Sequence, residues 1–244
     1  MINGINSREM ILEILLEIEE GEHSHVAIRN ALSKYQFLPK QDRAFITRVC
    51  EGTLEYRIQI DYIINSFSKV TVDKMKPAIR EILRSAVYQL KYMDSVPDSA
   101  VCNEAVKLAQ RKGFYNLKPF VNGVLRTIAR EMDQVRFPQK EDDLLKYLSV
   151  KYSMPEVLVT RWLEAYGEET TEKILADFLT EHPLTIRCRT YLNSKEEIIK
   201  SLESQGVHVA PAPYLPYAYS ISEFNHILAL DAFVKGKIVV QDVS

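Results

Sequence analysis

The stretch Lys118-Pro-Phe-Val-Asn-Gly-Val-Leu-Arg-Thr-Ile-Ala-Arg-Glu-Met132 has two different faces in one helical repeat. Its apolar residues recur at spacings of three and four, which places them on one stripe of an α-helix: Phe120, Val121, Val124, Leu125, Ile128, Ala129 and Met132. A helix also aligns four polar side chains as a ladder of donors without a carboxylate: Lys118, Asn122, Arg126 and Arg130. The stretch therefore predicts an amphipathic helix with a core face and a basic face.

Pro119 and Gly123 give further information about the structure and role of this predicted helix. Pro119 suits the first turn of a helix, where its missing N–H costs nothing. Gly123 costs about 1 kcal/mol of helix propensity relative to Ala, which predicts a packing or binding reason for the Asn122-Gly123 pair. Two interpretations of the basic face stay open, a binding surface or side chains that are merely solvated.

Composition places the chain among soluble globular proteins. Its 244 residues are 46% hydrophobic and 26% charged. No apolar run approaches the length of a membrane span, and the amino terminus lacks a basic region followed by an apolar one, so neither a span nor a secretory signal is expected. The three cysteines are far apart and form no CxxC pair, which argues against zinc and disulfides and favours a reducing cytoplasm.

The charge is unevenly distributed along the chain. Net charge is −2, but residues 69–136 carry 13 Lys and Arg against 7 Asp and Glu. Residues 137–244 carry 11 against 16. Any contact with a polyanion is therefore expected in the earlier block.

Hydrophobic periodicity predicts an all-α domain over residues 1–136. Proline, glycine and capping residues such as Asn6 separate its segments. The third segment keeps a helical period for almost its whole length, with Gly52 as a candidate bend. The expected helices span residues 6–21, 24–35, 39–67, 77–92, 97–113 and 118–132.

The second half predicts a helical linker region, residues 137–183, and an α+β domain, residues 184–244. Helices are expected near Asp142–Lys151, Pro155–Ala165 and Glu169–Glu181. The period then changes to the alternation of a half-buried strand at Leu184–Arg189. A helix from Ser194 to Gly206, a helix at Asn225–Phe233 and strands follow, at Val207–Val209, Tyr217–Ile221 and Lys237–Val240. That order is ferredoxin-like, an arrangement shared with RNA-recognition domains.

Catalytic motifs are scarce in this sequence. It contains eight glycines and no GxG, so it has neither a dinucleotide fingerprint nor a phosphate-cradling loop. No GxSxG elbow occurs, and the histidines lack the spacing of metal ligands. Cys50 lies on the apolar face of a predicted helix and is interpreted as a packing residue. The chain itself therefore predicts binding rather than catalysis.

The feature that favours a binding function is a set of basic ladders, that is, basic side chains four residues apart on predicted helices. Besides the opening stretch, four-residue spacings occur on two earlier helices, at Lys76, Arg80 and Arg84 and at Lys107 and Arg111. Three neighbouring helices with basic stripes would form one surface for RNA phosphates, or else three independently solvated faces. Arg187 and Arg189 share one side of a predicted strand, as an RNA platform or as an edge-strand solubility device.

The ordered motifs also resemble a known family. A first group closely resembles the signature shared by the antitermination factor NusB and the Sun-type (RsmB-type) 16S ribosomal RNA cytosine-5 methyltransferases: Val96-Pro97, Asn103-Glu-Ala-Val106, Lys112-Gly113 and Phe120-Val-Asn-Gly-Val-Leu-Arg126. A second group resembles the linker and small domain that only the methyltransferases have: Tyr152-Ser-Met-Pro155, Arg161-Trp162, Tyr166-Gly167 and Pro183-Leu-Thr-Ile-Arg187. The resemblance covers essentially the whole chain.

This resemblance implies the amino-terminal, RNA-binding and substrate-positioning module of a three-part enzyme, with a NusB-like domain followed by a ferredoxin-like one. In such an enzyme S-adenosylmethionine and the catalytic cysteines belong to a third domain, so no cofactor and no catalytic residue is expected in this chain, and whether it is an enzyme stays open. The expected partners are 16S ribosomal RNA and, as an alternative, a ribosomal protein. A cytoplasmic monomer without membrane contact is expected.

The expected RNA-binding residues combine the ladders with positions that match the family's motifs: Arg8, Arg80, Arg84, Lys107, Arg111, Lys118, Asn122, Arg126, Arg130 and Arg187. The sequence departs from the family at Cys188-Arg189-Thr190, where a hydrophobic residue and then asparagine are expected. Two other functions stay open, a NusB-like protein-interaction or antitermination module and a scaffold for a catalytic domain.

Overall fold

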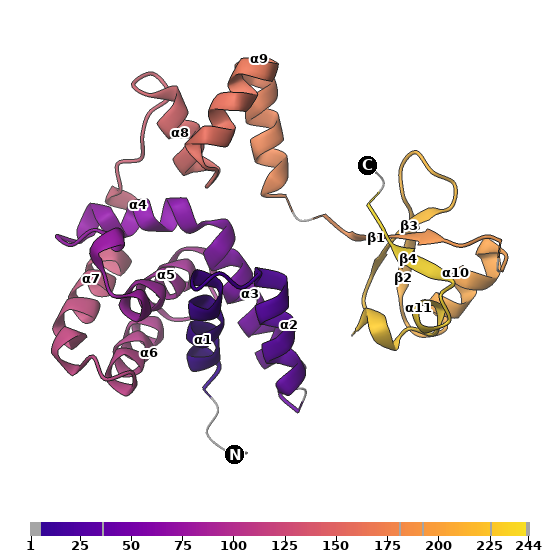
Figure 1. Ribbon diagram of the computed structural model, residues 1–244, viewed down its shortest axis with the longest axis horizontal. Helices are drawn as coiled ribbons and strands as arrows, with labels where there is room; N and C mark the ends of the chain where they lie inside the picture. Colours follow the sequence, from indigo (N-terminus) through magenta and orange to yellow (C-terminus); the bar gives the residue numbers. More distant parts are fainter. Residues whose placement is uncertain (1–5, 36, 181, 192, 225, 243–244) are drawn as a thin grey trace. The chain divides into compact units, whose positions relative to one another are not determined.

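The computed structural model describes residues 6–35, 37–180, 182–191, 193–224 and 226–242, and Figure 1 labels its helices and strands. The chain divides into two compact units, residues 1–179 and 180–244. Among the described residues the first unit is helical, and the second carries a small sheet with short helices. The predicted class, mainly α with a smaller α+β domain after it, is confirmed.

Helices α1 to α7 of the first unit share one hydrophobic core (Figure 1). Helix α5 lies at its centre, because it contacts five of the other helices and every residue from Glu81 to Gln89 is buried. The bounds are α1 Ser7–Glu19, α2 Ser24–Lys34, α3 Lys40–Glu55, α4 Arg57–Phe67, α5 Pro77–Tyr92, α6 Asp98–Arg111 and α7 Lys118–Glu131. Single 3-10 turns lie at Val72–Lys74, Tyr115–Leu117 and Met132–Gln134.

Helix starts follow the signals in the sequence. The Asn6 side chain accepts a hydrogen bond from the backbone N–H of Arg8 at 2.9 Å, which satisfies one donor that the first turn of α1 leaves unpaired. Pro77 and Pro119 occupy the first turns of α5 and α7. These three starts were predicted correctly because capping depends on residues close in sequence.

The predicted bend at Gly52 is wrong. The long third segment breaks at Tyr56, which separates α3 from α4 with φ −93° and ψ 17°. Gly52 lies inside α3, and a Cβ there would overlap the ring of Tyr88 on α5. The glycine therefore permits a close approach of α5 to α3 rather than a bend.

A helical hairpin follows at the carboxyl side of the first unit. It comprises α8, Leu144–Lys151, and α9, Glu156–Phe178, which is interrupted at Gly167 by φ 73° and ψ 175°. This interruption lies between the helices predicted near Pro155–Ala165 and Glu169–Glu181, and the predicted end at Glu181 lies outside the described residues. Gln59 on α4 joins the hairpin to the core, since its side-chain amide donates to the carbonyls of Val150 and Lys151 at 3.1 Å each.

The second unit is an antiparallel sheet in the order β2-β3-β1-β4. Its strands are β1 Leu184–Cys188, β2 His208–Pro211, β3 Ala218–Ser222 and β4 Ile238–Val240, and its helices are α10 Lys195–Glu203 and α11 Asp231–Val234. Alternate strand residues such as Ile186 and Ile221 share a core with Ile198 and Leu202 of α10. This is the predicted ferredoxin-like order. The helix expected at Asn225–Phe233 is only a 3-10 turn at Ile227–Ala229 followed by α11, and Asn225 lies outside the described residues.

Candidate nucleic-acid interface

Helices α6 and α7 pack against each other, and an open depression of about 440 Å³ lies between them. It brings together three of the residues that the sequence singled out, Lys107, Lys118 and Asn122. The complete lining is Asn103, Val106, Lys107, Gln110, Lys118, Pro119 and Asn122. The lining contains no carboxylate, so the local charge favours an anionic ligand.

Helix α7 presents the two faces that its sequence predicts. Val121, Val124, Leu125 and Ile128 are buried, whereas Lys118, Arg126 and Arg130 are exposed. Arg126 donates from Nε to Oδ1 of Asn122 at 2.9 Å, one turn earlier, which holds the guanidinium along the helix beside the depression. Burial raises the pKa of Cys102 on α6, and the positive charge of Arg126 offsets part of this rise. The polar face of α7 adjoins α6, because Lys118 and Asn122 of α7 line the same depression as Lys107 of α6.

Gly123 lies on this exposed surface. A Cβ built on Gly123 meets no atom within 4 Å, so no neighbouring element requires the missing side chain. The packing reason that the sequence left open is excluded for the described residues. The binding reason remains, because a missing side chain allows a ligand to approach the helix backbone.

The remaining cations of this surface differ in their partners. Lys107 forms an exposed pair with Glu104 at 2.7 Å, and this hydrogen bond lowers the pKa of Glu104. Arg130 binds the carboxylate of Glu131 at 2.6 Å. Arg111 lies on α6 one turn after Lys107 and is exposed. Exposed pairs of this kind contribute little and are readily exchanged for another anion.

The ladder on α5 does not belong to this surface, which corrects the expectation for Arg84. Its guanidinium is buried, with bonds of 2.7 and 2.6 Å to Asp61 on α4 and 2.5 Å to Glu81. Burial opposes the charge of Arg84, but the two carboxylates outweigh it and raise its pKa, so the arginine stays protonated. An arginine that neutralises two carboxylates inside the protein cannot contact RNA phosphates.

Arg80 and Arg8 are also engaged within the helical unit. Arg80 pairs with Glu19 of α1 and donates to the carbonyl of Val72 at 3.2 Å. Arg8 donates from Nε to Oε1 of Gln89 at 3.1 Å, and burial lowers its pKa. Both side chains are half-buried and hold α1 against α5. Neither shares the depression with Lys107 and Lys118.

Arg187 lies in the second unit. It is exposed on β1, with Ala218 of β3 and Val239 of β4 as its register partners. Its side chain occupies the face of the sheet opposite to Ile186 and Cys188, which belong to the core. Arg187 therefore presents its charge on the exposed face of the sheet in the second unit.

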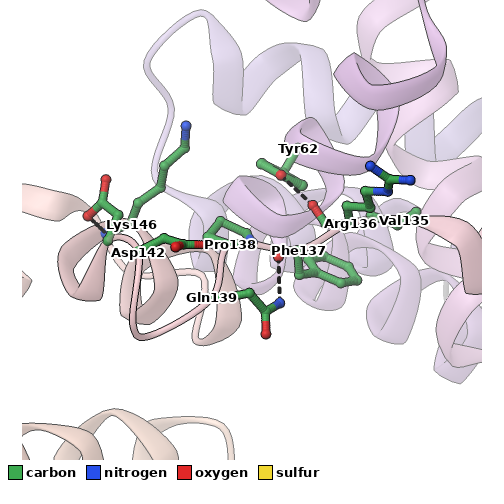
Figure 2. A pocket seen from close by; sticks show the side chains of 9 residues that line it. Tyr62, Val135, Arg136, Phe137, Pro138, Gln139, Asp142 and Lys146 are labelled. Atoms are coloured by element: carbon green, nitrogen blue, oxygen red, sulfur yellow. Dashed lines mark hydrogen bonds between the residues drawn. The ribbon is translucent and has the colours of Figure 1, made fainter.

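A second open depression, of about 600 Å³, lies beside Tyr62 of α4 (Figure 2). Tyr62 donates to the carbonyl of Arg136 at 2.6 Å, and its ring stacks on Phe137 with centroids 5.7 Å apart. The lining mixes the cations Arg136 and Lys146 with two aspartates, Asp142 and Asp143. This balance does not favour a polyanion.

The described residues hold no cluster that could bind a metal ion, and none of their helices is long and apolar enough to cross a bilayer.

Sequence reasoning overlooked Asn103 and Gln110. Both line the α6–α7 depression, seven residues apart and on the same side of α6 as Lys107. The basic ladders select lysine and arginine, so these two amide side chains were not included in the predicted RNA-binding set. The signal was present, because Asn103, Lys107 and Gln110 follow a helical spacing.

Comparisons with known proteins agree with this architecture. The model of the NusB family matches residues 5–130, which is more than half of the chain. The chain belongs to the NusB family. A second model, described as the RsmF/B-like methyltransferase ferredoxin-like domain, matches residues 154–227. The NusB-type match covers α1 to α7 almost completely, and the depression lies wholly within it.

Relatives match both units of this NusB-type chain. It is 30% identical over 237 residues to the probable ribosomal RNA small subunit methyltransferase B of Bacillus subtilis (strain 168), with 97% of this chain and 52% of the relative covered. The same enzyme of Synechocystis sp. is 29% identical, with 98% and 54% covered. The chain thus spans about half the length of these relatives. The solved structure of PH0851 shares the fold, with a TM-score of 0.70 at 24% identity, covering 98% of this chain and 54% of that one.

Proposed function

We propose that this chain is the RNA-binding, substrate-positioning module of an S-adenosylmethionine-dependent 16S ribosomal RNA cytosine-5 methyltransferase. The observation that carries the proposal is the carboxylate-free depression between α6 and α7, with Lys107, Lys118 and Arg126 around it. The relatives named as small-subunit ribosomal RNA methyltransferases supply the class of RNA. The module would hold the RNA so that one cytosine reaches a catalytic pocket.

The proposal assigns cofactor binding to a different part of the enzyme. The chain contains no GxG sequence, so it offers no glycine-rich loop for a cofactor. S-adenosylmethionine and the catalytic residues are assigned to the part of such an enzyme that this chain does not match. The proposal retains a three-part division into residues 1–136, 137–183 and 184–244, and it includes a cytoplasmic monomer.

Of the ten residues expected to bind RNA, the proposal keeps five on the α6–α7 surface: Lys107, Arg111, Lys118, Asn122 and Arg126. Arg130 extends that surface along α7. Arg187 is proposed as a separate contact from the second unit. Arg8 and Arg80 are assigned to the packing of α1 on α5, and Arg84 to the buried ion pairs.

RNA titration at several salt concentrations tests the proposal. The chain is titrated into a fluorescent small-subunit ribosomal RNA stem-loop and a scrambled control, and binding is followed by anisotropy. Each phosphate contact contributes about 0.7 to 0.9 to the slope of log affinity against log salt, so Lys107, Lys118 and Arg126 together account for about −2 to −3 of the slope. Replacing Lys107, Lys118 and Arg126 by Ala is expected to remove most of that slope.

A matched variant controls for net charge. Arg29→Ala with Lys34→Ala and Lys40→Ala also removes three cations, all from exposed positions of α2 and α3 on the same helical unit. It should leave both affinity and slope nearly unchanged. Equal losses in the two variants would mean that only net charge matters, and absence of binding at low salt would refute the proposal in favour of protein docking or a scaffold.

A further inference from the structure

The α6–α7 depression contains more hydrogen-bonding chemistry than phosphate contacts need. Three side-chain amides line it, Asn103, Gln110 and Asn122, in addition to Lys107 and Lys118. A phosphate only accepts hydrogen bonds, so a surface built for phosphates alone needs donors. An amide presents an acceptor beside a donor, which matches the edge of a nucleobase.

These amides have capacity left for a ligand. Asn122 accepts from Arg126 through Oδ1, which fixes the amide orientation and leaves its NH₂ group as a donor. For the side chains of Asn103 and Gln110, the described residues provide no hydrogen-bond partner. Pro119 is exposed and supplies apolar surface within the same depression, whose lining also includes the largely buried Val106. A flat base can pack on these residues while its edge meets the amides.

The size of the site and the position of the cations agree with one nucleotide. About 440 Å³ falls within the range of about 300 to 1,000 Å³ typical of small-molecule pockets. Lys107 on α6 and Lys118 on α7 flank the amides from both helices, where they can neutralise adjoining phosphates. Gly123 follows Asn122 and leaves the α7 surface open to the sugar-phosphate chain.

We propose that the α6–α7 depression binds one unpaired RNA base, whose edge is hydrogen-bonded by Asn103, Gln110 and Asn122 and whose phosphates contact Lys107 and Lys118. This inference rests on the proposed function and adds a preference for single-stranded RNA. The base must be unpaired, because pairing occupies its Watson–Crick edge and the deep major groove of an A-form helix excludes side chains.

Oligonucleotides of equal charge separate base recognition from phosphate binding. The probes are single-stranded homopolymers of A, U and C of about 12 nucleotides, within the range of single-strand site sizes. An abasic ribose-phosphate chain of the same length and a hairpin duplex with the same total number of phosphates are the comparisons. At least one homopolymer should bind about tenfold more tightly than the abasic chain. The duplex should bind no better than the abasic chain.

Two variants assign the effect to its residues. Asn103→Ala with Gln110→Ala retains helix-forming residues on α6 and should abolish most of the difference between RNA and the abasic chain, without altering the salt slope. Lys107→Ala with Lys118→Ala should weaken all single-stranded probes by a similar factor and reduce the slope. Circular dichroism of each variant should match that of the parent chain.

Three outcomes would overturn the inference. One is salt-dependent binding that is equal for RNA and the abasic chain, which would leave the proposed function intact. Another is a base preference that is undiminished in the amide variant, which would place base recognition elsewhere. The third is polyglutamate competing as well as RNA, which would identify an acidic protein segment as the ligand. No binding of any RNA would refute the proposed function itself.

Discussion

Gly123→Ala separates the stability of α7 from its proposed binding role. Gly123 lies inside the helix on its exposed side, and an added methyl group meets no atom within 4 Å. The substitution therefore removes a helix-destabilising residue without creating a clash. It also adds one methyl group to the surface on which RNA is proposed to lie.

The expected gain in stability follows from helix propensity. Ala is more favourable than Gly in a helix interior by about 1 kcal/mol, partly because the unfolded chain loses conformational freedom. For a unit of the size of residues 1–179, such a gain raises the melting temperature by about 2 to 4 °C. The affinity for single-stranded RNA should fall, because the methyl group stands between the ligand and the helix backbone.

Urea unfolding followed by circular dichroism measures the first effect, and RNA anisotropy measures the second. Asn30→Ala is the matched control, since Asn30 is exposed on α2 and gains helix propensity on a remote face. It should stabilise the chain slightly and leave RNA affinity unchanged. A destabilised Gly123→Ala variant would refute the open space above Gly123, and unchanged RNA affinity would refute close approach of RNA at this point.

Three other changes test ion pairs and hydrogen bonds of the helical unit. Arg84→Ala leaves Asp61 and Glu81 without their buried partner and should lower the unfolding free energy by about 3 to 5 kcal/mol. As the control, Arg130→Ala at an exposed position should change it by less than about 0.5 kcal/mol. Urea unfolding measures both. The Ser153 hydroxyl accepts a hydrogen bond from the backbone N–H of Ile58 at 3.0 Å, so Ser153→Ala should lower the unfolding free energy by about 1 kcal/mol. Ser153→Gly should lower it less, because glycine tolerates the φ of 53° at this position. Equal losses in the two variants would contradict backbone strain at Ser153. A hydrogen bond from Lys151 lowers the pKa of Glu172, so the pair stabilises the fold above the pKa that this carboxyl has in the unfolded chain, and the stabilisation is lost as pH falls through the folded pKa. Glu172→Gln should therefore reduce the loss of unfolding free energy below about pH 5, by less than about 1 kcal/mol. An unchanged decrease of stability at acid pH would contradict this.

The sequence by itself determined the class of the fold and most element starts. Helix α7 was predicted with both of its faces, because an amphipathic period and a proline in the first turn are local properties. The ferredoxin-like order was equally local, since strand alternation and the cap at Ser194 are read within a few residues. Lys107 and Lys118 were also identified, because the four-residue spacing of basic and polar side chains along a helix is visible in the sequence.

Only the tertiary structure decided which polar residues remain on the surface. The spacing of Lys76, Arg80 and Arg84 is the same as that of Lys118, Asn122 and Arg126, yet Arg84 is buried against Asp61 of another helix. Gly52 was similarly ambiguous until Tyr88 was placed above it. Helical spacing fixes which side chains share a face, but the packing of several helices around α5 fixes which face meets a neighbour. The depression between α6 and α7 exists for the same reason, since its two rows of side chains come from separate helices whose pairing no local pattern specifies.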